Sequence, residues 1–352
     1  MDKESVAVVK CNNYNQKNVD NAVEESLRLI GFSFKPKMKV LIKPNIIGSY
    51  PKNQDAITTH PSVIKAVCKI LKKNKCKIYI GDSPFMNSAL SFKNSGIEKI
   101  ADEYGEMVIF EKQSMIRVYD KHAKILKNFM LAKLVKDVDL IIDMPKLKTH
   151  MLTKYTGAVK NLYGCLPGGV KQRIHKKAKG DEKFSKVLVD IYQNIKPELT
   201  IMDAVIGMEG EGPTSGIPKK TGYILSSKNA IALDIAASEM IGLKKGEINV
   251  INEAIRRKLY PSYDFKLLGI KKLPNLKFKI PNTEKKAQNM MNKMFIEKPI
   301  IVDKLKCTKC GTCAKNCPAG AISLIPFPSF DKKKCIRCFC CIEICPNHAI
   351  SV

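Results

Sequence analysis

Residues 39–80, KVLIKPNIIGSYPKNQDAITTHPSVIKAVCKILKKNKCKIYI, contain one complete strand–helix–strand unit. The β-branched runs Lys39–Ile42 and Lys77–Ile80 predict two strands, and the apolar spacing of Pro61–Lys73 predicts a helix between them. A strand, a helix and a second strand in this order form a βαβ unit, which places the two strands parallel in one sheet. This stretch therefore predicts a parallel sheet with a helix packed on its face.

The same alternation continues on both sides of this unit, up to about residue 270. Further strands are predicted at Val6–Val9, Met107–Phe110, Leu140–Asp143, Leu199–Met202 and Tyr223–Ser226. Further helices are predicted at Val19–Ile30, Ile97–Tyr104, Lys186–Ile195, Ala230–Ile241 and Val250–Leu259. Residues 1–270 are therefore expected to form an α/β domain, with a mostly parallel sheet and helices on both faces.

The carboxyl-terminal part of the chain is rich in cysteine. Of the 13 cysteines, eight form two runs of one spacing, Cys307-x2-Cys310-x2-Cys313-x3-Cys317-Pro318 and Cys335-x2-Cys338-x2-Cys341-x3-Cys345-Pro346. This is the ligand spacing of bacterial-type proteins that hold two [4Fe–4S] clusters, where the fourth cysteine of each run ligates the other cluster. The predicted ligand sets are Cys307, Cys310, Cys313 and Cys345 for one cluster and Cys335, Cys338, Cys341 and Cys317 for the other.

A zinc site or a disulfide framework would also use many cysteines. Zinc is typically bound by C-x2-C pairs that a longer stretch separates, so these alternatives fit the spacing less well. Cys340 lies between two predicted ligands and is interpreted as a further thiol. Cys11, Cys68 and Cys76 are interpreted as small buried hydrophobes, and core packing is favoured over reactivity for Cys165.

Residues 301–352 are therefore expected to be a small ferredoxin-type domain with two clusters. Residues 271–300 before it are rich in lysine, proline and asparagine and are predicted to be a connector. Basic residues surround the cysteine runs: Lys304, Lys306, Lys309, Lys315, Lys332, Lys333, Lys334 and Arg337. They favour an acidic, low-potential electron-donor protein as a partner, although a solvated charged surface would have the same composition.

The chain carries a formal net charge of +28. Lysine is spread along the whole sequence, and aromatic residues do not interleave with basic runs, so nucleic acid is not favoured as a partner. No apolar run is long enough to span a bilayer, and the first residues lack the pattern of a signal peptide. Because cluster-forming thiols need a reducing compartment, we expect a cytoplasmic protein of an anaerobic host, without a membrane partner.

Polar motifs follow several of the predicted strands. The carboxyl ends of parallel strands meet at one edge of a sheet, and ligands bind in the crevice there. The residues predicted to bind a small anionic substrate at this edge are Lys43, Asn45, Lys146, Lys148, Asn161 and Asp203, and those predicted to act in catalysis are Lys160, His150, Asp82 and Glu209. Cationic, amide and carboxylate side chains around one mouth are typical of a site for a polar ligand.

Each of these residues has an ordinary structural alternative. Lys146 and Lys148 would face the same side of an extended segment and clasp a carboxylate or phosphate, or they would form a solvent-facing edge. His150 and His60 lie at strand ends, where a structural hydrogen bond or helix cap is the alternative to a proton donor or metal ligand. Asp82 would orient a substrate or a metal, or cap the next helix.

Two glycine-containing segments carry different predictions. Gly157–Gly164 brackets Lys160 and Asn161 at a helix start, which predicts stabilisation of an anion or enolate, with close helix packing as the alternative. Gly210–Gly216 has the wrong spacing for a dinucleotide-binding motif, and Pro213 interrupts any following helix. This second segment is predicted to be a lid over a ligand or a long turn, and NAD and ATP are not indicated.

Together, these motifs resemble the domain-of-unknown-function 362 family, in its form with a carboxyl-terminal double-cluster ferredoxin. The resemblance covers about residues 5–240 and rests on Lys43-Pro44-Asn45, Thr59-His60-Pro61, Gly81-Asp82-Ser83, Pro145–His150, Gly157–Gly164 and the segment from Asp203 to Gly216. The family is described as iron–sulfur-associated. The resemblance implies that the α/β domain and the cluster domain work as one protein, and it implies no particular reaction.

The leading hypothesis is an iron–sulfur oxidoreductase that passes single electrons to a polar or anionic organic substrate bound in the α/β domain. One alternative is a non-enzymatic, ferredoxin-like electron carrier whose α/β domain docks a partner. Another is a maturation or regulatory protein that uses its clusters as sensors.

Overall fold

The computed structural model of the chain describes residues 3–48, 54–84, 87–178, 180–281, 300–335 and 340–351. The strands of the α/β body are β1 (Ser5–Lys10), β2 (Lys39–Pro44), β3 (Lys77–Asp82), β4 (Glu106–Ile109), β5 (Met115–Tyr119), β6 (Asn128–Ala132), β7 (Leu140–Met144), β8 (Lys146–His150), β9 (Lys154–Tyr155), β10 (Leu199–Glu209), β11 (Ile217–Ser227) and β12 (Lys266–Leu268). Its helices are α1 (Gln16–Leu29), α2 (Gln54–Ile57), α3 (Pro61–Lys73), α4 (Ser88–Asn94), α5 (Ile97–Tyr104), α6 (Leu134–Asp137), α7 (Gly157–Asn161), α8 (Gly168–Lys177), α9 (Asp181–Ile195), α10 (Ala230–Met240) and α11 (Asn249–Arg256), with short 3-10 turns η1 (Phe110–Lys112) and η2 (Leu162–Cys165).

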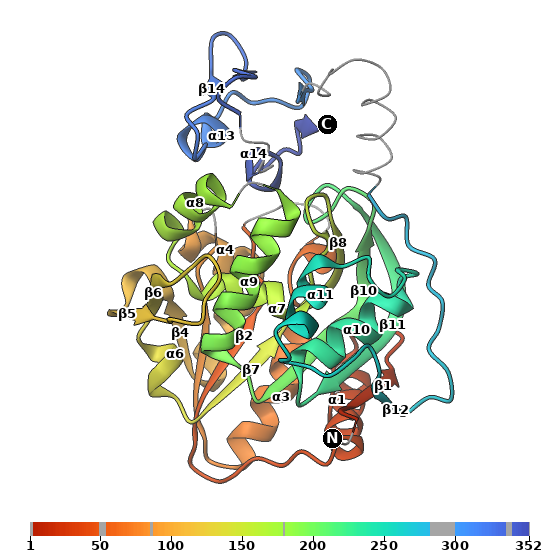
Figure 1. Cartoon of the computed structure of the whole chain (residues 1–352). Coiled ribbons are helices and arrows are strands. Elements are labelled where there is room, and N and C mark those ends of the chain that lie inside the picture. The colour runs from red at the N-terminus through yellow and green to blue at the C-terminus, as the bar shows by residue number, and fades with distance from the viewer. Residues whose placement is uncertain are drawn as a thin grey trace.

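The central sheet has the strand order β12-β1-β11-β10-β7-β2-β3-β4, and β8 and β9 extend it from β10 (Figure 1). Its neighbours from β10 to β4 are all parallel, as are β12 with β1 and β8 with β10. Strand β11 is antiparallel to both β1 and β10, because a short turn joins β10 directly to β11. The prediction of a mostly parallel α/β sheet is therefore confirmed.

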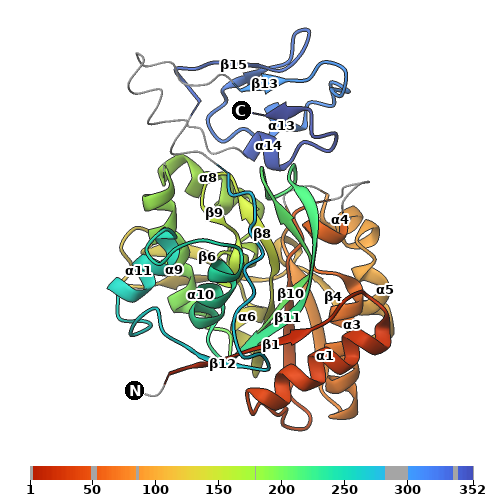
Figure 2. The ribbon, with the colours of Figure 1, turned by 90° about the vertical axis from the view of Figure 1, so that its right-hand side faces the viewer.

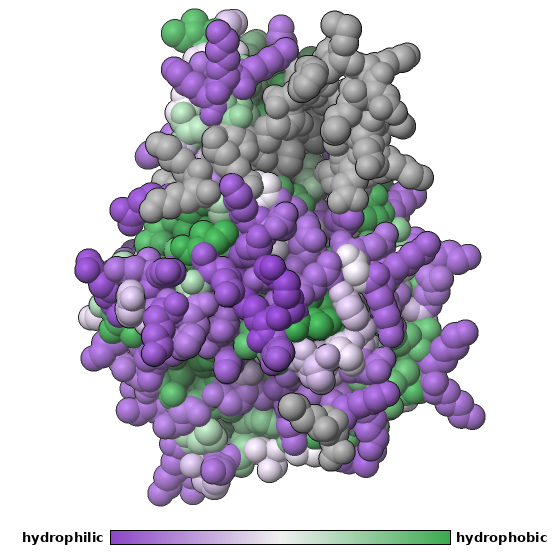
Figure 3. All heavy atoms as spheres, viewed as in Figure 1, coloured by the Kyte–Doolittle hydropathy of each residue, from purple (hydrophilic) through white to green (hydrophobic). Residues whose placement is uncertain are grey.

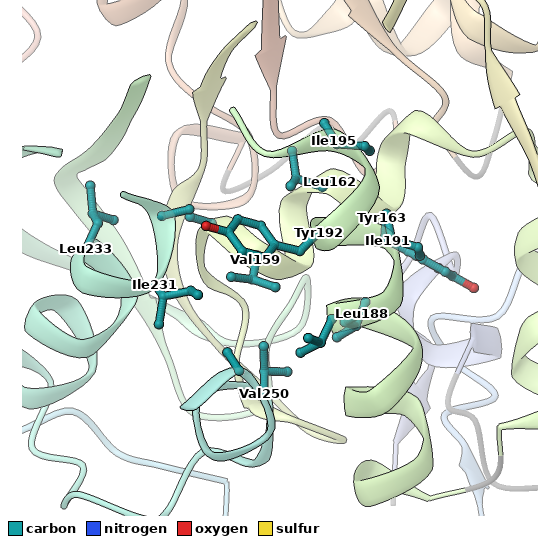
Figure 4. Close-up of a cluster of buried hydrophobic side chains, with 14 of the residues drawn as sticks. Val159, Leu162, Tyr163, Leu188, Ile191, Tyr192, Ile195, Ile231, Leu233 and Val250 are labelled. Atoms are coloured by element: carbon teal, nitrogen blue, oxygen red, sulfur yellow. The ribbon is translucent and has the colours of Figure 1, made fainter. Parts of the chain in front are cut away.

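Two hydrophobic cores cover the two faces of the sheet. Along β2, Leu41 belongs to one core and its neighbours Val40 and Ile42 belong to the other, as the two-residue period of a strand requires. Helices α1, α3 and α5 supply the core on one face, and α7, α9, α10 and α11 supply the core on the other (Figure 2). Figure 4 shows part of the second core, where Tyr192 and Leu188 of α9 face Val159 of α7 and Val250 of α11.

Local sequence signals explain where the elements begin and end. Helix α3 has the predicted bounds because Pro61 occupies its first turn, and the His60 ring accepts a hydrogen bond from the Ser62 amide at 3.2 Å. Helix α5 also has its predicted bounds. The residues Lys146–His150, which were not among the predicted strands, form strand β8, and the β5–β6 hairpin and α8 were not predicted either.

The cysteine-rich module lies at the end of the body where the β10–β11 turn, β8 and α8 are found (Figures 1 and 2). Its described elements are β13 (Ile301–Val302), α13 (Thr312–Lys315), β14 (Ile322–Ser323), β15 (Ser329–Phe330), α14 (Cys340–Glu343) and β16 (Ile350–Ser351). Strand β13 pairs with β16 and β14 pairs with β15, both antiparallel. The body contributes Met151, from the turn between β8 and β9, to the small core of the module.

The segment before the module was predicted to be a connector over residues 271–300. Most of it, 282–299, lies outside the described residues, and in the described part Phe278 is buried in a core of the body. Within the ranges that the structure describes, no helix is both long and apolar enough to cross a membrane.

Candidate functional site

The polar site of the body lies where the strand order changes direction. From β2 the chain proceeds to β3 and β4 on one side, and it later returns to β7 and β10 on the other. The ends of β2 and β7 are paired in register, Lys43 with Asp143 and Pro44 with Met144. A crevice opens at such a switch point, outside the carboxyl ends of the strands, and it is the usual ligand site of α/β sheets.

A pocket of about 490 Å³, open to solvent, occupies this position. The ends of β2 and β3, helices α7 and α8, and the β10–β11 turn form its walls. Of the predicted site residues, five line it: Lys43, Asn45, Asp82, Lys160 and Asn161. Ser83, Lys171 and Tyr163 also line it and were not predicted. We call this cavity the switch-point pocket.

An ion pair between Lys43 and Asp82 forms part of the pocket wall. The Lys43 Nζ atom lies 2.9 Å from Asp82 Oδ2, and both side chains are almost fully buried. Asp82 also accepts hydrogen bonds from the amides of Ile46 at 2.9 Å and Ser83 at 2.7 Å. Burial raises the pKa of the Asp82 carboxyl, and the neighbouring Lys43 and Lys171 oppose that rise.

Gly164 lies directly against this ion pair. A Cβ atom at that position would lie 2.4 Å from Asp82 Oδ1 and 2.6 Å from Lys43 Nζ, closer than atoms can approach. The backbone of η2 therefore reaches the pair only because residue 164 has no side chain. The second glycine of the predicted Gly157–Gly164 motif is thus explained by a close approach of the backbone to the pocket wall.

Lys171 adds a second amine beside Asp82. Its side chain comes from α8, is 2 % exposed, and contacts the backbone oxygen of Ser83 and, at 3.3 Å, the Ser83 hydroxyl. Burial lowers the pKa of the Lys171 amine to about 8, and the charge of Asp82 opposes the decrease. Helix α8 contains several lysines, so its sequence did not distinguish Lys171 as a pocket residue.

Asn161 connects the pocket to a buried carboxyl group. Its side-chain amide donates hydrogen bonds to Asp143 Oδ1 at 2.7 Å and to the Lys43 backbone oxygen at 3.2 Å. Asp143 is fully buried, and its Oδ2 atom has no hydrogen-bond partner among the described residues. Burial holds the pKa of Asp143 well above its usual range, and the hydrogen bond from Asn161 and the charge of Lys43 oppose that rise.

Asp234 fixes the start of α7, which carries Lys160 and Asn161. Its carboxylate accepts hydrogen bonds from the Ala158 amide at 2.6 Å, the Val159 amide at 3.0 Å and the Tyr155 hydroxyl at 3.0 Å. Burial raises the pKa of Asp234 to about 7 despite these donors. No local pattern predicts this role, because Asp234 lies in the interior of α10 and 76 residues beyond Ala158.

Lys146 and Asp203 do not reach the switch-point pocket. They pair across β8 and β10 at 2.8 Å with no exposed side-chain surface, and Asp203 also accepts a hydrogen bond from the Tyr14 hydroxyl at 3.0 Å. The Tyr14 ring stacks on His60 with 3.6 Å between ring centroids. Since Ile201 and Val205 lie in the core beneath α1 and α3, Asp203 faces the side of the sheet away from α7.

Lys148, His150 and Glu209 are also placed elsewhere. The buried Lys148 amine donates to the Ile57 backbone oxygen at 2.7 Å, so neither lysine of β8 forms a solvent-facing edge. His150 Nδ1 accepts from the Leu152 amide at 3.0 Å and orders the turn after β8. Glu209 pairs with Lys219 at 2.8 Å across the β10–β11 hairpin. These predicted site residues therefore do not line the pocket.

The turn between β10 and β11 connects the pocket with the cysteine-rich module. Pro213 lines the switch-point pocket, and the Gly212 oxygen accepts a hydrogen bond from the Met151 amide at 3.0 Å. The Ser215 hydroxyl lies 3.3 Å from His348 Nδ1 in the module. The long-turn alternative for residues 210–216 is thus the observed structure, and the turn contacts both parts of the chain.

The residues present in the module fit a cluster. Cys307, Cys310, Cys313 and Cys345 all line one pocket of about 320 Å³, which is the predicted ligand set with its crossed fourth cysteine. Across the described residues, no three histidine, cysteine or acidic side chains converge on a point as they would around a single metal ion. Four thiolates around a cavity suit a four-iron cluster, whose irons each take one thiolate, better than one zinc ion.

The second predicted ligand set is described in part. Cys317, Cys335 and Cys341 are described, and Cys338 lies outside the described residues. The two runs share one local feature: the Ala321 amide lies 3.3 Å from Cys317 Sγ, and the Ala349 amide lies 3.2 Å from Cys345 Sγ. The cysteines that the structure describes form no disulfide, and Cys11, Cys68, Cys76 and Cys165 are buried as expected.

Comparison with known sequences identifies the family. The sequence model described as "Domain of unknown function (DUF362)" matches residues 40–239. The chain belongs to the DUF362 family. The model described as "4Fe-4S binding domain" matches residues 300–323 of this DUF362 protein, so its DUF362 domain is joined to a 4Fe-4S binding domain. All the residues named above as lining the switch-point pocket lie within the DUF362 match.

Two further proteins are similar to this DUF362 chain. The thylakoid-associated protein sll1697 of Synechocystis sp. is 30% identical over 245 residues, which are 68% of this chain and 74% of that protein. The lactate racemase apoprotein of Thermoanaerobacterium thermosaccharolyticum aligns with a TM-score of 0.43 and 12% identity, over 68% of this chain. The match spans 57% of the length of the racemase.

Proposed function

We propose that this protein is an iron–sulfur oxidoreductase that passes single electrons to a small anionic organic substrate in the switch-point pocket. The observation that carries the proposal is the pocket itself, which Lys43, Lys160 and Lys171 line at the edge of the sheet nearest the cysteine-rich module. Among the described lining residues, Asp82 is the one carboxylate beside these three lysines. The excess of positive charge in a partly buried cavity favours an anion.

Two [4Fe–4S] clusters are proposed as the cofactors, held by the two crossed sets of four cysteines. When bound, they would supply electrons singly, at potentials that the surrounding protein tunes. We propose a cytoplasmic location in an anaerobic host, since the ligand thiols require reducing conditions. The relative from Synechocystis is named for association with thylakoids, so binding to a membrane surface is tested below.

The residues of the pocket divide the chemical work. Lys160 neutralises the substrate anion, Lys43 stays paired with Asp82 in the pocket wall, and Asn161 is oriented by its bond to Asp143. Reduction of an organic double bond consumes two electrons and two protons. The Lys171 ammonium can donate one proton because its pKa lies near 8, and solvent at the open mouth of the pocket supplies the other.

Electron transfer to a bound anion is tested by cluster reoxidation. We expect the anaerobically reduced protein, freed of excess reductant, to be reoxidised rapidly by one fraction of small anionic metabolites. The Lys160→Ala variant should need about 10- to 100-fold more of that fraction, because it loses one charge-assisted contact. Visible absorbance of the clusters gives the rate, and Lys99→Ala, an exposed lysine on α5, is the matched control.

The opposite result identifies the electron carrier instead. If no fraction reoxidises wild type, yet a redox protein does so equally in wild type and Lys160→Ala, the α/β domain is a docking module and the proposed reaction is wrong.

The charge of Lys171 predicts how anion binding depends on pH. Sulfate keeps one charge state over the range used, so its affinity should fall as pH rises from about 7 to about 9, where the Lys171 amine loses its proton. The decrease should not exceed about tenfold per pH unit, since one proton is involved. Calorimetric titration of the holoprotein measures it. Lys171→Met should bind sulfate more weakly and with a flat profile, and an unchanged pH dependence in that variant would exclude Lys171 as the titrating group.

A further inference from the structure

The cysteine-rich module exposes large apolar side chains to solvent, which is unfavourable for a surface that binds no partner. Leu305 is 99% exposed and Ile325 is 91% exposed, more than any other large hydrophobic residue of the described chain. Elsewhere the visible surface is largely hydrophilic, with apolar areas scattered among charged side chains (Figure 3). Exposed apolar side chains that a polar rim surrounds mark sites of interaction.

Lysines surround these two residues. The amines of Lys304 and Lys309 both lie over the ring of Phe327, at 5.7 and 4.5 Å from its centroid, so the segments before the first cysteine and around residue 325 meet here. In the sequence, residues 301–352 contain seven lysines and Arg337 but three acidic residues, Asp303, Asp331 and Glu343. We call Lys304, Leu305, Lys309, Ile325 and Phe327 the Leu305 patch.

The Leu305 patch adjoins the pocket of the first cysteine set. Lys309 and Pro328 line that pocket together with Cys310, which is exposed to solvent. The other side of the same cysteine set faces the body, because Cys313 and Cys345 are buried in one core with Met151. The module therefore has one side that contacts the α/β body and another, basic and apolar, that solvent can reach.

We propose that the Leu305 patch docks an acidic electron-donor protein. The inference rests on the proposed function and names the partner from which the electrons come. In the docked complex the donor would pass one electron to the cluster that the cysteines beside Cys310 would hold, and no proton needs to move. Basic residues around an apolar centre would steer an acidic partner and release it quickly, as transient redox complexes require. A lipid surface would have no need of an exposed ligand cysteine within the contact, so the electron donor is favoured.

The test uses the full-length holoprotein and a reduced acidic flavodoxin as the donor probe, under anaerobic conditions. Binding is measured by calorimetry, and electron transfer by stopped-flow absorbance, at low and at high salt. We expect Lys304→Glu/Lys309→Glu to weaken binding at least about tenfold at low salt and to slow electron transfer equally. Leu305→Ser should slow it at both salt concentrations. The control, Lys72→Glu/Lys99→Glu, makes the same change of net charge on exposed residues of the body.

Each other outcome overturns the docking surface. If the Lys304→Glu/Lys309→Glu variant binds the flavodoxin as tightly as the control does, the donor docks elsewhere. If wild type binds vesicles of half phosphatidylserine through Leu305 and flavodoxin does not compete, the Leu305 patch is a membrane surface. If Leu305→Ser instead dissociates a dimer, the occupant is a second copy of the chain.

The failure of this inference can be distinguished from failure of the proposed function. Photoreduced deazaflavin is a small neutral reductant, so it should reduce the clusters of every variant at the wild-type rate, and iron content confirms that the clusters are intact. If flavodoxin docks but no metabolite fraction reoxidises the clusters, the docking proposal for the Leu305 patch is supported and the proposed oxidoreductase function is wrong. If a metabolite fraction reoxidises the clusters but flavodoxin does not dock, the oxidoreductase function is supported and the docking proposal is wrong.

Discussion

Replacing Cys345 with alanine is expected to remove one of two clusters and leave the other. Iron content should fall from about eight to about four atoms per chain, because Cys345 lines the same pocket as Cys307, Cys310 and Cys313 and is proposed to complete their ligand set, although it lies 32 positions beyond Cys313. Electron paramagnetic resonance of the reduced variant should show one isolated cluster in place of two interacting ones. Reoxidation by the substrate fraction should stop if the lost cluster connects donor and pocket.

The matched variant is Cys340→Ala. Cys340 is as deeply buried as Cys345 and lies in the same module, but it belongs to neither predicted ligand set. It should keep the full iron content. Loss of one cluster from Cys340→Ala, with full iron in Cys345→Ala, would show that the crossed assignment of ligands is wrong.

The second large effect is expected on stability, and it comes from the buried ion pair of Lys146 and Asp203, which does not line the pocket. Asp203→Ala should lower the free energy of unfolding by about 3–5 kcal/mol, because it leaves the fully buried Lys146 amine without its counter-charge. Lys146→Met should lower the free energy of unfolding by less than Asp203→Ala does. In that variant the Asp203 carboxylate keeps three donors, the Tyr14 hydroxyl and the amides of His60 and Val205.

Urea unfolding followed by far-ultraviolet circular dichroism measures both changes. The double variant Asp203→Ala/Lys146→Met should be more stable than Asp203→Ala alone, since it buries no unpaired amine. Glu103→Ala serves as the control: it removes an ion pair of similar length, 2.9 Å to Lys65, from an exposed site and should lower the free energy of unfolding far less than Asp203→Ala does. An Asp203→Ala variant as stable as this control would show that the buried pair does not form.

The candidate site was predictable where its residues follow strands directly. Lys43, Asn45 and Asp82 lie at the ends of β2 and β3, and the topology of an α/β sheet brings such ends together. Lys160 and Asn161 were found through their flanking glycines. Lys171 was not found, because the sequence of α8 contains several lysines, and the burial of Lys171 depends on how α8 packs over Ser83.

Strand β8 shows the limit of sequence reasoning most clearly. Its composition, Lys-Leu-Lys-Thr-His, allowed a solvent-facing edge, yet every residue of the strand is buried. The partners that permit this burial are distant in the chain: Asp203 lies 57 residues from Lys146, and Ile57 lies 91 residues from Lys148. A buried lysine is tolerated only when such a partner is in place, so local pattern cannot predict it.

The sequence by itself determined the α/β class and the 4Fe-4S module, because strand and helix periods and ligand spacing are local properties of the chain. Only the tertiary structure decided which polar residues share a pocket. Successive side chains of a strand point to opposite faces. Strand β10 therefore sends Asp203 toward Tyr14 on the face of α1 and α3, while Lys43 follows Leu41 on the other face and lines the switch-point pocket. The packing of the module on Met151 likewise depends on two segments that meet only in the folded protein.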